Sequence, residues 1–94
     1  MTKSEVEKAI KVVMFDVIEE CYRFSSSSSP KNKNRVFEIA HEAENTMDEL
    51  ISAVREVKQK GKKSVYNPKI LEIKEKLNQK SMDYLNRLHN LEYH

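Results

Sequence analysis

Few side chains in this sequence are of the types that carry out catalysis or bind metals, and the best spaced lie in the segment Glu38-Ile39-Ala40-His41. A glutamate and a histidine three residues apart on a helix form the pair that di-iron bundles project into their interior. Here Ala40 and Ala43 have the spacing of core residues, so Glu38 and His41 fall on the opposite, polar side. The acidic neighbours of His41 also disfavour its use as a phosphoryl acceptor. The spacing therefore predicts no metal site.

The other reactive residue types are isolated from one another. Cys21 has no histidine near it in the sequence and lies among apolar residues at helical spacing, so we expect it in the core. Gly61 is the only glycine, which excludes a glycine-rich phosphate loop. We therefore expect no catalytic residues, no metal, no cofactor and no small-molecule substrate, and we predict that the chain is not an enzyme.

The elements that position these residues are predicted to be three helices of one domain. The chain has 94 residues with one glycine and two prolines, and its hydrophobic spacing indicates helices over about 4–24, 35–60 and 68–92. The short connection over 62–67 makes the second and third helices antiparallel. The fold class predicted is all-α, an antiparallel up-down-up three-helix bundle with a long hairpin of the second and third helices.

The second and third helices have the most regular patterns. In the second helix apolar residues recur at alternating intervals of four and three, the spacing of a coiled-coil seam, and the third helix has a similar seam interrupted between Leu77 and Tyr84. In the second helix these residues are Val36, Ala40, Ala43, Met47, Leu50, Val54 and Val57. In the third they are Ile70, Ile73, Leu77, Tyr84, Leu88 and Leu91, after an Asn67-Pro68 pair typical of a helix start.

A serine-rich segment, FSSSSSPKNKN over 24–34, separates the first two helices. Its composition predicts a flexible linker over 25–34. A phosphorylation site at Ser29-Pro30 is the alternative, because a phosphate there would lie beside Lys31 and Lys33.

The hairpin from about Met47 to Leu85 resembles the small two-helix aspartyl-phosphate phosphatases of the sporulation phosphorelay, which also join two antiparallel helices through a glycine-containing loop. That family carries Ser-Gln-x-x-Asp on its second helix, whereas the matching residues here are Lys74-Glu75-Lys76-Leu77-Asn78. The resemblance therefore implies a helical hairpin, and phosphatase activity does not carry over with it.

The first helix has more apolar surface than one side of a bundle needs. Its main apolar sector is centred on Ile10 and Val17, while Phe15 and Tyr22 widen that sector and Val12 falls outside it. Monomeric proteins rarely expose such a surface. We expect this helix to contact a protein partner, most simply a second copy in a two-fold homodimer. The predicted contact residues are Val12, Phe15, Ile18 and Tyr22.

Charge is distributed unevenly, which suggests two other surfaces. Residues 36–57 include one basic and six acidic residues, and the polar face of this helix is a second candidate protein-binding surface, formed by Glu38, His41, Glu42, Asn45, Asp48 and Glu49. Residues 58–69 include five lysines and no acidic residue. Four of them, Lys58, Lys60, Lys62 and Lys63, are the alternative site, which would bind nucleic acid through its phosphates. The acidic helix between this cluster and the basic residues of 25–35 disfavours that alternative.

The sequence thus predicts a small, non-enzymatic helical interaction module, acting as a regulator, adaptor or inhibitor, with a nucleic-acid-associated protein as the alternative. A single cysteine permits no intrachain disulfide, which fits the cytoplasm. The sequence lacks an apolar run of the roughly 18 residues that a membrane span needs, so we expect no membrane association.

Overall fold

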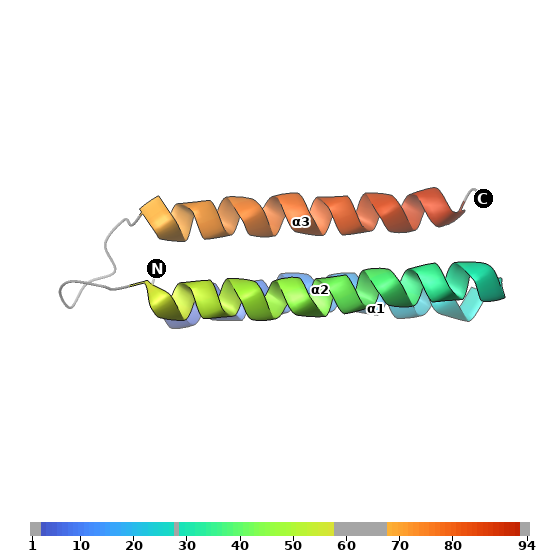
Figure 1. Cartoon of the computed structure of the whole chain (residues 1–94), viewed down its shortest axis with the longest axis horizontal. Coiled ribbons are helices and arrows are strands. Elements are labelled where there is room, and N and C mark those ends of the chain that lie inside the picture. The colour runs from blue at the N-terminus through green and yellow to red at the C-terminus, as the bar shows by residue number, and fades with distance from the viewer. Residues whose placement is uncertain (1–2, 28, 58–67, 93–94) are drawn as a thin grey trace.

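The computed structural model of the chain describes residues 3–27, 29–57 and 68–92, and the elements within them are three helices (Figure 1). Helix α1 spans Lys3–Ser27, α2 spans Pro30–Glu56 and α3 spans Pro68–Glu92. Each helix packs against the other two, and α1 packs more extensively on α2 than either of them packs on α3. The prediction of an all-helical bundle of three helices is confirmed.

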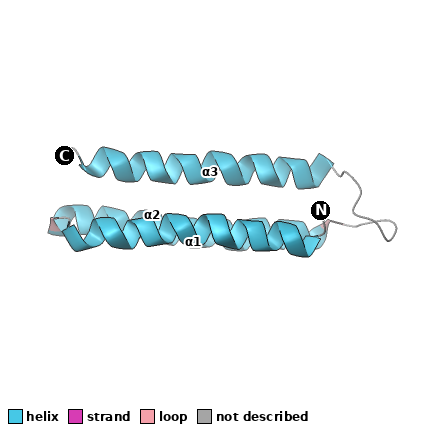
Figure 2. Cartoon of the chain, turned by 180° about the vertical axis from the view of Figure 1, so that it is seen from behind, coloured by secondary structure: helices cyan, strands magenta, loops and turns pink. Residues whose placement is uncertain are grey.

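Side-chain hydrogen bonds show which helix ends are neighbours. At the start of α1, the Lys3 ammonium donates to the carbonyl oxygens of Arg55 at 2.9 Å and Val57 at 2.8 Å. At the start of α2, Asn32 Nδ2 donates to the carbonyl oxygen of Leu91 at 3.3 Å. Both donors reach the C-terminal end of another helix, where backbone acceptors lack intrahelical partners. The start of α1 therefore lies beside the end of α2, and the start of α2 beside the end of α3 (Figure 2).

The core is a continuous apolar column between the helices. The predicted seam of α2 is buried throughout, except for the half-buried Met47. The α3 seam is buried at its centre, with half-buried Ile70 and Leu91 near its ends. Helix α1 adds Val6, Ile10, Met14, Val17, Ile18 and Cys21. Full burial of one such aliphatic side chain stabilises the fold by about 1.5–3 kcal/mol, so this column is the main source of stability.

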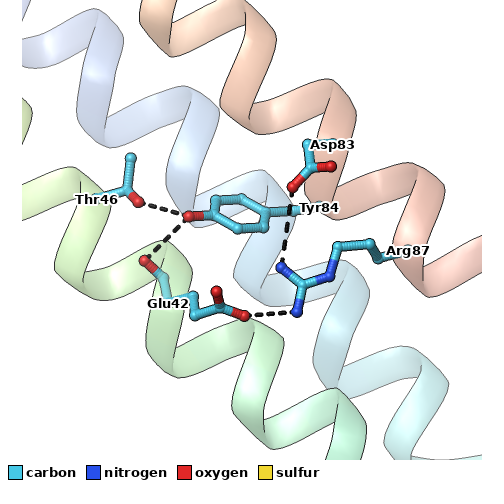
Figure 3. Close-up of polar contacts among 5 residues, drawn as sticks. All are labelled: Glu42, Thr46, Asp83, Tyr84 and Arg87. Atoms are coloured by element: carbon cyan, nitrogen blue, oxygen red, sulfur yellow. Dashed lines mark hydrogen bonds and ion pairs between the residues drawn. The ribbon is translucent and has the colours of Figure 1, made fainter.

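A buried polar contact joins α2 to α3 (Figure 3). The Thr46 hydroxyl oxygen lies 2.5 Å from the Tyr84 hydroxyl oxygen, which is 3.3 Å from the carbonyl oxygen of Glu42. Tyr84 has one hydroxyl hydrogen; when it is donated to Glu42, Thr46 is the donor to Tyr84. Beside this contact, Arg87 binds the Glu42 carboxylate at 2.6 Å, and its guanidinium carbon lies 5.9 Å from the centre of the Tyr84 ring.

The turn between α1 and α2 differs from the predicted flexible linker over 25–34. Helix α1 continues through Ser27, and α2 already begins at Pro30. The hydroxyl of Ser26 donates at 2.8 Å to a carbonyl oxygen one turn earlier, which is compatible with a helix end. Ser29 is the N-cap of α2, because its side chain accepts a hydrogen bond at 3.3 Å from the backbone N–H three residues later. The linker prediction is therefore wrong for residues 25–27 and 30–34, which are helical, whereas Ser29 caps α2 and Ser28 lies outside the described residues.

The other boundaries lie closer to the predicted ones. Helix α1 begins one residue before position 4, and α3 covers the predicted range 68–92. Helix α2 ends at Glu56 rather than at position 60, because Val57 has an extended backbone with φ −69° and ψ 122°. The Val57 side chain is buried, and its carbonyl accepts the hydrogen bond from Lys3. Residues 58–60 lie outside the described part of the chain.

Candidate interaction surface

Three apolar side chains of α1 remain about half exposed in the bundle. The exposed fractions are 54% for Val12, 51% for Phe15 and 54% for Tyr22, and we call these three residues the α1 patch. Ile10 and Val17, on the same helix, are 0% and 1% exposed. The helix is therefore fully buried on one side and still presents apolar groups on another.

Helix geometry places the members of the α1 patch together. Phe15 and Tyr22 are seven residues apart, which is about two turns, so their side chains project from the same side of α1. Val12 precedes Phe15 by three residues and is its neighbour on the helix surface. The expectation that these three side chains are not covered by the other two helices agrees with their exposure.

Ile18 does not lie in this surface. It was predicted as a contact residue, but it is only 7% exposed and belongs to the core. Although it lies between Phe15 and Tyr22 in the sequence, it is rotated by about 40–60° from them toward the buried side, at 100° per residue. Ile18 is therefore corrected to a core residue.

Phe37 of α2 is a further half-exposed aromatic residue, which the sequence did not predict. Its ring is 48% exposed. It precedes Arg55 by 18 residues, or five full turns, so it lies on the same side of α2 as Arg55, which binds Glu7 of α1 at 2.7 Å. Counting from the contact of Lys3 with the end of α2, Phe37 lies at about the level of Tyr22 along the bundle. Both rings therefore lie along the outer edge of the packing between α1 and α2.

The acidic face of α2 and the lysine cluster that follows it are the two other surfaces that the sequence predicted. All six residues of the predicted acidic surface, Glu38, His41, Glu42, Asn45, Asp48 and Glu49, are exposed on α2. The Glu42 carboxylate already binds Arg87 and, through that hydrogen bond above all, raises the pKa of the Arg87 guanidinium above its ordinary value. The predicted basic patch, Lys58, Lys60, Lys62 and Lys63, lies outside the described residues.

No group of three or more His, Cys, Asp or Glu side chains in the described ranges could hold a metal ion. Cys21 is fully buried, and burial raises the pKa of its thiol to about 11, so it is a poor nucleophile.

A shallow hollow of about 240 Å³ lies between the end of α2 and the start of α3. Three apolar side chains and three charged ones line it: Ala53, Val57, Ile73, Glu56, Lys69 and Glu72. A small-molecule site usually encloses most of its ligand among apolar groups with a few convergent polar ones. This hollow is small and open, and we assign it no ligand.

Comparisons with known proteins identify no relative of this chain. No protein-family model matches the chain, and neither the curated proteins nor the solved structures include a match. In the described part of the chain, none of the helices combines the length and apolar character required to cross a membrane. Functional inference therefore depends on the exposed surface of the bundle itself.

Proposed function

We propose that this chain is a small, non-enzymatic helical interaction module, a regulator, adaptor or inhibitor that presents the α1 patch to a protein partner. The partner proposed first is a second copy of the chain, giving a two-fold homodimer of up-down-up three-helix bundles. The antiparallel neighbours at the helix ends support that topology, as seen at Lys3 and Asn32. A cytoplasmic location fits the free, buried thiol of Cys21.

The observation that carries the proposal is the exposure of two aromatic rings on a helix whose other side is fully buried. Phe15 is 51% exposed and Tyr22 is 54% exposed, and Val12 and Phe37 are also about half exposed. Completing the burial of one such half-exposed side chain would contribute about 1 kcal/mol. Aromatic residues also dominate the binding energy of protein interfaces at small cost in side-chain entropy. A partner helix over the α1 patch would therefore gain several favourable contacts at once.

Analytical ultracentrifugation tests the proposal directly. We expect the wild-type chain of 11.1 kDa to sediment as a dimer at micromolar concentration and the variant Phe15→Ser/Tyr22→Ser to sediment as a monomer. Met82→Ser is the matched control, because Met82 is a 64% exposed apolar residue on α3, outside the α1 patch. A wild-type chain that stays monomeric would exclude the homodimer.

A pull-down separates the proposal from the nucleic-acid alternative. We expect partner capture to be lost in Phe15→Ser and kept in Lys60→Glu/Lys62→Glu. The reverse pattern, together with binding that weakens steeply with salt, would instead favour phosphate contacts by the lysines.

A further inference from the structure

Exposed side chains of opposite charge flank Phe15 on α1. Lys8 and Lys11 precede Phe15 by seven and four residues, and Glu19 follows it by four. All three charged residues are exposed. At 100° per residue, Lys11 and Glu19 each lie about 40° from Phe15 around the helix, so both flank the ring closely. Among the described residues, neither of these two forms an ion pair within the chain.

We infer that the second copy lies antiparallel to the first, with the two-fold axis passing beside Phe15. This inference deepens the proposed function and rests on it. Around such an axis, residues equally far before and after Phe15 face one another in the two copies. Lys11 then faces the partner's Glu19, and Glu19 faces the partner's Lys11. The axis itself brings Phe15 against the partner's Phe15.

The charges favour this orientation over the parallel one. A parallel pairing would place Lys11 against the partner's Lys11 and Glu19 against the partner's Glu19, so every flanking contact would be repulsive. The antiparallel pairing makes both contacts attractive and also places Lys8 near the partner's Tyr22, where an ammonium group can interact with the aromatic face. An apolar centre with a charged rim is the usual anatomy of a specific interface. Charge complementarity thus selects one orientation of the second copy.

Charge reversal at the two flanking positions tests the orientation. In Lys11→Glu each antiparallel contact becomes Glu against Glu, and in Glu19→Lys it becomes Lys against Lys. We expect each single variant to raise the dissociation constant of the dimer about tenfold at low salt. Mixing the two single variants should give a heterodimer of about wild-type affinity, because both of its contacts have opposite charges. The double variant Lys11→Glu/Glu19→Lys should recover homodimer affinity for the same reason.

Two reversals on another helix serve as matched controls. Lys76→Glu and Glu75→Lys change the same charges at exposed sites of α3 and should leave the dissociation constant within about twofold of wild type. Measurement by ultracentrifugation at two salt concentrations should also show that the effects at Lys11 and Glu19 shrink at high salt.

The outcomes separate this inference from the function on which it rests. Weakening by both single variants with recovery in the mixture and in the double variant supports the antiparallel dimer. A dimer that Phe15→Ser dissociates, but that both charge reversals leave intact, overturns the orientation and keeps the α1 interface. Weakening in the single variants without recovery in the double variant also overturns it. A monomeric wild-type chain overturns both the orientation and the homodimer.

Discussion

The hydroxyl group of Tyr84 is held in the core by two hydrogen-bond partners on α2, the Thr46 hydroxyl and the backbone carbonyl of Glu42. An apolar heptad seam packs almost equally well after a shift of one repeat, whereas a buried polar pair is satisfied in a single register. Tyr84 and Thr46 are 3% and 7% exposed, so water cannot replace a lost partner. We infer that this pair selects the register of α2 against α3.

Removal of the Tyr84 hydroxyl should destabilise the fold. In Tyr84→Phe the Thr46 hydroxyl loses its partner in the core, which should lower the free energy of unfolding by about 1–2 kcal/mol. Urea denaturation measures this change. The double variant Tyr84→Phe/Thr46→Val removes both polar groups and should recover part of the loss, whereas strictly additive effects of the two substitutions would argue against a coupled pair.

Cys21 should make the stability of the fold depend on alkaline pH. Burial first, and the nearby Glu20 charge to a lesser degree, raise the pKa of the thiol from 9.0 to about 11, against a backbone hydrogen bond that lowers it. The unfolded chain therefore loses the thiol proton at a lower pH than the folded chain. The contribution of the protonated thiol to the free energy of unfolding is complete below pH 9 and is lost between about pH 9 and 11. The loss amounts to roughly 2–3 kcal/mol at 1.36 kcal/mol per pKa unit.

The variant Cys21→Ala isolates this effect from the tyrosines and lysines that titrate in the same range. Urea denaturation at pH 8 and pH 11 should show that the stability difference between wild type and Cys21→Ala narrows at the higher pH. An equal difference at both pH values would mean that the thiol has the same pKa in the folded and unfolded chain.

The start of α2 depends on the cap provided by Ser29. Its side chain accepts the hydrogen bond from the N–H of Asn32, and Pro30 follows at the first helical position. Ser29→Ala should therefore destabilise the fold by about 1 kcal/mol. Ser26→Ala is the matched control, because Ser26 donates only to a carbonyl of its own helix and alanine is the better helix former. Urea denaturation should show a loss for Ser29→Ala alone, and equal effects of both changes would contradict the cap.

The buried faces of the helices could be predicted from the sequence more completely than the helix boundaries. The seams of α2 and α3 follow from spacing alone, because a heptad repeat defines one buried face. The start of α2 could also have been predicted, since Ser29-Pro30 is the same cap-and-proline signal as Asn67-Pro68. The serine composition of 25–29 indicated a linker. In the structure α2 nevertheless begins at Pro30 with Ser29 as its N-cap, as the Ser29-Pro30 pair indicates.

The candidate site was predictable only in part. The width of the apolar sector of α1 pointed to Phe15 and Tyr22, and Val12 is an apolar residue outside that sector; all three are exposed. Periodicity cannot decide how far a neighbouring helix wraps around the edge of such a sector. For that reason Ile18 was predicted as a contact residue, although it is buried. At 100° per residue it lies less than one-fifth of a turn from the exposed Phe15 around the helix. The position of Phe37 also depends on how α1 and α2 align along the bundle, which neither sequence pattern specifies.

For the whole molecule, dimerisation through the α1 patch should couple stability to protein concentration. When folding and association are linked, each tenfold rise in concentration stabilises the folded dimer by about 1.4 kcal/mol, so the urea midpoint should increase with concentration. Phe15→Ser/Tyr22→Ser should unfold at a midpoint independent of concentration, because its monomer gains nothing from association. Met82→Ser should keep the wild-type dependence, since Met82 lies on α3.

This comparison distinguishes an interface from a local packing role of the two aromatic rings. If Phe15 and Tyr22 served only to cover the flank of their own bundle, serine substitution would lower the midpoint equally at every concentration, and the wild-type midpoint would itself be constant. A wild-type midpoint that rises with concentration and a variant midpoint that does not are expected only when the rings are buried by a second chain. The half-exposed rings of α1 are then the surface that converts a marginal 94-residue bundle into a more stable assembly.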